Sequence, residues 1–94
     1  DVLLDIPERF LLKAAFPNPF NPVTTIGFDV PNPSNVKLIV YDLVGRQVAQ
    51  LVDDYQHPGN YFINWDATGL PSGMYLIKMT ADDFISTQKV MLVK

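Results

Sequence analysis

The sequence contains no cysteine and only one histidine, His57. The absence of cysteine excludes a disulfide framework, although it leaves an extracellular location open. One histidine without cysteine cannot build a zinc or copper centre. A nucleophilic hydrolase needs a serine or cysteine beside a histidine base. Here the histidine lies in a predicted turn beside Pro58 and the G-x-S-x-G elbow is missing, which argues against that class.

Basic side chains are also scarce, with seven Lys and Arg against ten Asp and Glu and a net charge of −3. Nucleic-acid binding requires a basic face that neutralises phosphates, so we expect no nucleic-acid partner. No apolar run approaches the roughly 20 residues of a membrane-spanning helix, and we expect no membrane insertion. The chain opens at Asp1 without a signal peptide, so it is interpreted as a module of a longer polypeptide.

The acidic residues do not form a predicted catalytic pair. Asp53-Asp54 and Asp82-Asp83 are sequence neighbours, whose side chains point apart, whereas a glycosidase pair converges from about 5–9 Å. We interpret both pairs as solvated turn charges. Calcium binding at the turn 66–69 (Asp-Ala-Thr-Gly) is left as an alternative, although the D-x-[DN]-x-[DN]-G loop is absent. We therefore predict a domain that is not an enzyme and has no cofactor.

Short alternating strands separated by turns dominate the rest of the chain, which has 94 residues and 48% apolar content. We predict an all-β fold, an immunoglobulin-like or fibronectin III-like antiparallel β-sandwich of about seven strands. Six strands are expected at 24–30, 36–43, 47–52, 60–65, 74–80 and 84–93. Residues 10–16 form a seventh or an edge element, with helix as a minor alternative. Residues 1–9 are expected to link the sandwich, 10–94, to a preceding parent domain.

The alternation assigns a core face to each strand. Three sets of side chains are expected to face the core: Ile26, Phe28 and Val30; Val36, Leu38 and Val40; Tyr61, Ile63 and Trp65. Val44-Gly45-Arg46 is predicted to be a tight hairpin loop, because glycine tolerates positive φ. These assignments place the aromatic side chains in one small core.

The stretch FPNPFNP, residues 16–22, cannot be a helix or a central strand, because proline fixes φ and lacks a backbone donor. We predict a stiff, extended connector at a sheet edge, where prolines limit pairing with other chains. Phe16 and Phe20 are both expected to pack over the open end of the sandwich, since burial of each is worth roughly 2–3 kcal/mol.

Four runs carry a resemblance to a known family: FPNPFNPVTTIGFDVP, VKLIVYDLVGRQVAQLVD, HPGNYFINWDATGLPSGMYLIKM and TQKVMLVK. In this order and spacing they resemble the C-terminal sorting domain of the type IX (Por) secretion system, type A, from about Glu8 to Lys94. The same residues also resemble the immunoglobulin-like domain of the flagellar hook-capping protein.

The first resemblance implies a function. Such a domain ends a large parent protein, which reaches the cell surface of a Gram-negative bacterium through the periplasm and an outer-membrane translocon. A sortase-like surface peptidase then removes the domain, upstream of it and near residues 1–10. The matching residues, candidates for translocon recognition, are Pro17, Asn18, Pro19, Gly73, Tyr75, Lys78, Lys89 and Lys94.

Some of these residues also fit purely structural roles. Gly73 fits a turn that needs positive φ or close approach of the backbone. Tyr75 fits a buried core tyrosine whose hydroxyl is hydrogen-bonded. Lys78 and Lys89 are expected to face solvent; if their strands are neighbours they form a cationic ridge, the predicted docking surface. The last strand, 84–93, is expected to accept a partner by strand addition.

Two other functions stay open. The chain could be a cell-surface attachment or carbohydrate- or protein-binding module of a secreted hydrolase, or it could be a structural spacer. The sugar-binding case is the weaker, because Trp65 is expected to be buried. The isolated domain is expected to be a monomer.

Overall fold

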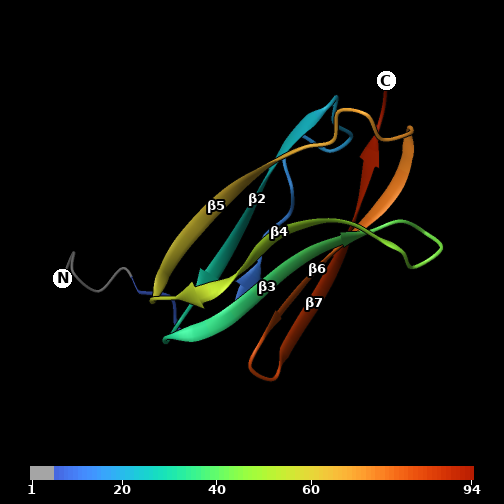
Figure 1. Ribbon diagram of the computed structural model, residues 1–94. Helices are drawn as coiled ribbons and strands as arrows, with labels where there is room; N and C mark the ends of the chain where they lie inside the picture. Colours follow the sequence, from blue (N-terminus) through green and yellow to red (C-terminus); the bar gives the residue numbers. More distant parts are fainter. Residues whose placement is uncertain (1–5) are drawn as a thin grey trace.

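The computed structural model describes residues 6–94, so residues 1–5 of the predicted linker lie outside it. The strands are β1 (Leu11–Leu12), β2 (Val23–Val30), β3 (Ser34–Tyr41), β4 (Gln47–Gln56), β5 (Gly59–Asp66), β6 (Gly73–Ala81) and β7 (Phe84–Leu92). They form a three-stranded sheet in the order β1-β2-β5 and a four-stranded sheet in the order β4-β3-β6-β7 (Figure 1). The predicted seven-stranded antiparallel sandwich is confirmed.

Most strand boundaries differ from the prediction by one residue at most, and three differ by more: β3 starts earlier, at Ser34, and ends earlier, at Tyr41, and β4 ends later, at Gln56. β4 continues to Gln56, and Asp53 and Asp54 pair with β3 instead of forming a turn. An edge strand with solvent on its outer side accepts such charges, so composition alone is a poor guide there. β3 stops at Tyr41, because the Asp42 side chain accepts hydrogen bonds from Val44 and Arg46 and starts the hairpin turn.

The segment 10–16 is an edge element, and the helix alternative is wrong. Leu11 and Leu12 pair with β2. After an irregular stretch, Phe16 forms an isolated antiparallel bridge with Thr25. No helix among the described residues is long and apolar enough to cross a membrane. The chain therefore enters the three-stranded sheet along one side of β2.

The core lies between the two sheets and follows the strand alternation. All three expected side chains of β2 and all three of β3 are buried. On β5, Trp65 is buried, whereas Tyr61 and Ile63 are half-buried because this strand is an edge. Trp65 contacts two aromatic rings, with centroid distances of 5.3 Å to Phe20 and 5.7 Å to Tyr75. This aromatic cluster joins the sheets at one end of the sandwich.

The two phenylalanines of FPNPFNP have opposite environments. Phe20 is 2% exposed and packs on Trp65, as expected. Phe16 is 79% exposed, so its predicted burial is wrong. The reason is its bridge with Thr25, whose half-buried side chain lies on the outer face of the sheet; paired residues point to the same face.

Replacement of Phe20 by alanine is expected to lower the free energy of unfolding by about 3–5 kcal/mol, because it empties a site inside the aromatic cluster. The matched variant Phe16→Ala, in the same motif, should change it by less than about 0.5 kcal/mol, since that ring faces solvent. Urea denaturation followed by tryptophan fluorescence measures both. Equal losses in the two variants would contradict the assignment.

Candidate functional site

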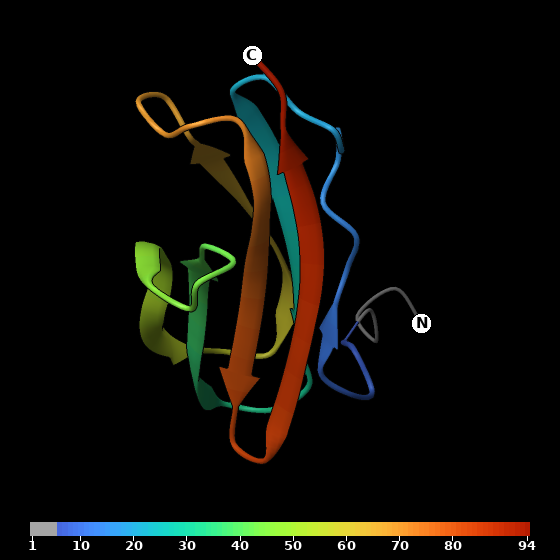
Figure 2. The same cartoon turned by 90° about the vertical axis from the view of Figure 1, so that its right-hand side faces the viewer.

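The proline-rich segment is bound along the last strand. Asn18 accepts a hydrogen bond from the Met91 N–H (2.9 Å) with Oδ1 and donates one to the Lys89 carbonyl (3.2 Å) with Nδ2. The Phe20 N–H donates to the Met91 carbonyl, and the Val93 N–H donates to the Phe20 carbonyl, each over 2.9 Å. Asn18 and Phe20 therefore occupy the outer edge of β7 where another strand would otherwise pair. In Figure 2 the segment that connects β1 to β2 runs beside β7.

The side-chain amide of Gln88, on β7, closes the same side of the sandwich nearer the start of that strand. The Gln88 Oε1 accepts the Ala15 N–H over 2.9 Å, and its Nε2 donates to the Lys13 carbonyl over 2.7 Å. Gln88 thus joins β7 to the segment after β1. Sequence reasoning missed this residue, because a glutamine that satisfies two backbone groups looks like any polar strand residue. The strand addition expected at β7 would therefore find a free strand edge only over a short stretch, around Ile85 and Thr87.

Pro17, Asn18 and Pro19 are exposed on this closing segment. The Pro17 carbonyl accepts a hydrogen bond of 2.7 Å from the buried Thr24 hydroxyl. Proline offers no N–H donor, and the Asn18 side chain already makes its two hydrogen bonds to β7. These three residues hold the segment in place, and their remaining surface faces solvent.

Lys78 and Lys89 lie on the neighbouring strands β6 and β7 and share the outer face of the four-stranded sheet. Lys78 is opposite Thr87 and Lys89 is opposite Leu76, so the two lysines are diagonal neighbours. On β3, Ile39 is opposite Lys78 and Lys37 is opposite Thr80. A third lysine, Lys37, therefore continues the diagonal, which we call the lysine diagonal (Lys37, Lys78, Lys89).

The lysine diagonal lacks ion-pair partners. Among residues 6–94, the only side-chain ion pairs within 4.0 Å are Lys13 with Asp29 and Arg46 with Asp42. Apolar side chains such as Ile39 and Leu76 lie between the three lysines in the sheet. The diagonal is thus a positive strip on an acidic domain, although Asp53 on β4 lies opposite Lys37 at one end of it. Lys94 follows the end of β7 and is exposed, outside this strip.

Gly73 and Tyr75 both have a structural role. Gly73 has a φ of +150°, which few other residues adopt, and a Cβ placed there would meet nothing within 4 Å. The backbone conformation, rather than crowding, favours glycine at this position. Tyr75 is buried, stands edge-on to Trp65, and donates its hydroxyl to the Pro71 carbonyl over 2.6 Å.

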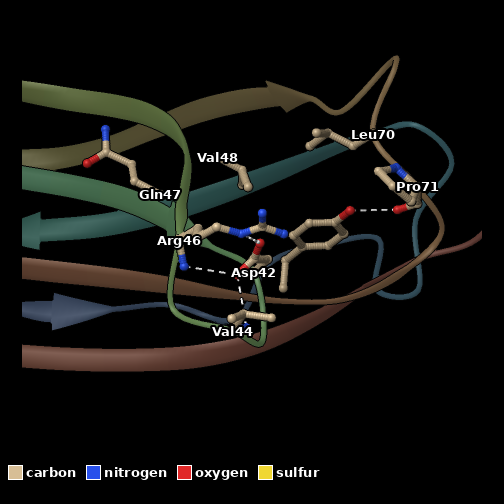
Figure 3. A pocket seen from close by; sticks show the side chains of 8 residues that line it. Asp42, Val44, Arg46, Gln47, Val48, Leu70 and Pro71 are labelled. Atoms are coloured by element: carbon tan, nitrogen blue, oxygen red, sulfur yellow. Dashed lines mark hydrogen bonds and ion pairs between the residues drawn. The ribbon is translucent and has the colours of Figure 1, made fainter.

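Two sequence motifs that lie far apart in the chain meet at a groove of about 530 Å³ (Figure 3). One wall is the β3–β4 hairpin with Asp42, Val44 and Arg46, and the other is the loop with Leu70 and Pro71. As predicted, the hairpin is tight, with its glycine at positive φ. The sequence did not reveal that the motifs meet, because their contact depends on the packing of the two sheets.

The hairpin is held by one carboxylate. Asp42 Oδ1 accepts the Val44 and Arg46 N–H groups, each over 2.9 Å, and Oδ2 lies 3.0 Å from the Arg46 Nε. The hydrogen bond from the Arg46 backbone N–H is the main reason that the pKa of Asp42 lies below its ordinary value of 3.8. Asp42 and Arg46 neutralise each other, so this pair fixes the hairpin shape and adds no net charge to the groove.

The turn considered for calcium is already internally bonded. Asp66 Oδ1 accepts the Thr68 hydroxyl over 2.6 Å and the Thr68 N–H over 3.0 Å. The hydroxyl is the first cause of a lowered pKa of Asp66. Among the described residues no group of three or more His, Cys, Asp or Glu side chains is placed to hold a metal ion.

A model of the family described as secretion system C-terminal sorting domain matches residues 14–94. The chain belongs to this family. It is the sorting signal of type IX secretion, a non-catalytic domain that directs a larger parent protein out of the cell. The parent is thus a secreted or cell-surface protein. A comparison with curated proteins found no match.

Replacement of Asn18 by alanine should remove both hydrogen bonds to β7. We expect a loss of about 1 kcal/mol in the free energy of unfolding and faster hydrogen exchange at the Met91 amide, which loses its acceptor. Asn21→Ala is the control, because Asn21 is exposed and makes no side-chain hydrogen bond among residues 6–94. Unchanged exchange at Met91 in the Asn18 variant would contradict the proposed closure.

Acid should loosen the β3–β4 hairpin. Because the folded pKa of Asp42 is lowered, its contribution to stability is present above its ordinary pKa of 3.8 and is lost as the pH falls through the folded pKa. The amide resonances of Val44 and Arg46 should therefore shift together with the Asp42 carboxyl carbon in an NMR titration. In Asp42→Asn, which cannot titrate, both amide shifts should stay flat over this range.

Proposed function

We propose that an outer-membrane translocon recognises this domain through the outer face of the four-stranded sheet, with the lysine diagonal as its centre. The parent protein crosses from the periplasm to the cell surface, and a sortase-like surface peptidase then cuts upstream of β1. In this proposal the domain is of type A. The observation that carries it is three lysines on one face that form no ion pair among residues 6–94, in a domain whose net charge is −3; Asp53 lies opposite Lys37, so Lys78 and Lys89 carry most of the argument.

The charge pattern supports an acidic partner surface. A positive strip on an acidic molecule orients the domain as it approaches, because the rest of its surface is repelled by the same partner. The apolar side chains between the lysines, Ile39 and Leu76, provide the area that a stable contact needs.

The lysine diagonal exists only in the folded domain. Lys37 is on β3, whereas Lys78 and Lys89 are on β6 and β7, and strand pairing brings the three together. A translocon that requires this arrangement would accept folded cargo and ignore an unfolded tail. Pro17, Asn18, Pro19, Gly73 and Tyr75 would then act as positioning residues, since they fix the strands that present the lysines.

The attachment alternative lacks its best binding residue. Trp65 is 4% exposed and packed between Phe20 and Tyr75, so it cannot stack on a sugar ring. No observation on the described residues favours the structural spacer over the sorting function.

Charge reversal tests the recognition face. A reporter fused to the domain should be exported about tenfold less in Lys78→Glu/Lys89→Glu, because steering is reversed, while stability changes by no more than about 1 kcal/mol. Surface and periplasmic fractions of the reporter in a type IX-competent host measure export, and thermal unfolding measures stability. Arg9→Glu, an exposed charge reversal beside the other sheet, is the control. Normal export of the double variant would contradict the proposed face.

A further inference from the structure

The two sheets have four edge strands, and three of them are protected against pairing with another chain. β1 is only two residues long. β7 is occupied by Asn18 and Phe20. β4 carries Asp53 and Asp54 and pairs irregularly with β3, with two register shifts. Short length, coverage, charges and bulges are the usual means by which proteins keep sheet edges unpaired.

β5 has none of these protections. It runs for eight residues, pairs with β2 without a register shift, and carries no charge before its last residue, Asp66. Its only neighbour in the sheet is β2. In Figure 2 β5 lies at the back on the left, away from the segment that covers β7. The sandwich is therefore closed on one side and has an open, regular edge at β5.

The free backbone groups of β5 follow from the register. Thr25 N–H and C=O bond to Phe16, and the Gly27 carbonyl accepts from Lys13, so these β2 residues point toward β1. The backbone N–H and C=O groups of the alternate β2 residues then point toward β5 and bond with the backbones of Tyr61, Ile63 and Trp65. The N–H and C=O groups of the alternate β5 residues, Asn60, Phe62 and Asn64, therefore point outward. Outside the strand pairing, these backbone groups make no hydrogen bond within residues 6–94, although the Asn64 side chain accepts one from the Thr25 hydroxyl over 2.8 Å.

Apolar side chains flank this edge on both faces. On the outer face Phe62 is 68% exposed, and on the inner face Tyr61 and Ile63 are half-buried. The Phe62 ring lies against Gly27, where an added Cβ would be 3.0 Å from its Cε1, and the Lys13 ammonium is 5.3 Å from the ring centroid. The Phe62 ring is thus held in place beside the free edge although most of it is in water.

We propose that β5 is a docking edge for an extended, alternating apolar segment of the secretion machinery, which adds a strand to the three-stranded sheet. This inference rests on the sorting function proposed above. Outward N–H and C=O groups that repeat about every 6.8 Å along a strand are matched by another extended backbone, and not by a helix or a sugar. A second copy of the domain is disfavoured as the occupant, because each copy carries a charge of −3.

The test separates the backbone of Phe62 from its side chain. Phe62→Pro removes an N–H that has no partner in the domain, so the fold should persist, whereas an added strand loses a donor and meets the proline ring. Phe62→Ala keeps the N–H and removes the ring. In the reporter export assay, Phe62→Pro should lower the exported fraction about tenfold and considerably more than Phe62→Ala does. Circular dichroism and thermal unfolding report whether each variant folds.

Each outcome decides one point. If the wild-type fusion stays in the periplasm, the sorting function itself fails. If it is exported and Phe62→Pro is exported equally well, the docking edge is wrong and the sorting function stands. Should Phe62→Pro not fold, Asn60→Pro, whose N–H also points outward, takes its place against Asn60→Ala. A concentration-dependent dimer that Phe62→Pro abolishes without loss of export would assign the edge to a second copy and overturn the proposed partner.

Discussion

The backbone pairing of Phe20 with the end of β7 is the constraint on which the rest of the structure depends. It is a parallel bridge between the segment before β2 and the last strand, and it joins the two sheets at one side. The same residue inserts its ring against Trp65 in the aromatic cluster. One residue therefore sets the position of the chain entering β2, closes the edge of β7 and fills the end of the core.

This closure determines which surfaces are available. Because Asn18 and Phe20 already bond to the outer edge of β7, the last strand offers its side chains to a partner rather than its backbone. Lys89, which projects from this strand, remains exposed. On the opposite side of the sandwich β5 keeps its free backbone groups. The proposed side-chain recognition and the proposed backbone recognition thus lie on different sheets.

The strands and their core faces could be predicted from the sequence, because alternation of apolar residues reports which face of a strand is buried. This worked for β2, β3 and β5. The predicted burial was correct for Phe20 and wrong for Phe16, since a proline-rich segment has no regular period and nothing in it distinguishes two equally apolar rings. Their environments depend on backbone pairing, of Phe16 with Thr25 on β2 and of Phe20 with Met91 on the last strand, which the pattern of the segment does not reveal.

The candidate surfaces were predictable only in part for the same reason. Alternation places Lys78 and Lys89 on the outer side of their strands, but it says nothing about which strands are neighbours. Lys37 joins them only because β3 pairs with β6, a connection that skips β4 and β5 in the sequence. A recognition feature assembled from three strands by register is therefore a property of the folded domain. Under the proposed recognition, the sorting signal would report that its own domain has folded before the parent protein is exported, which a short linear tail cannot do.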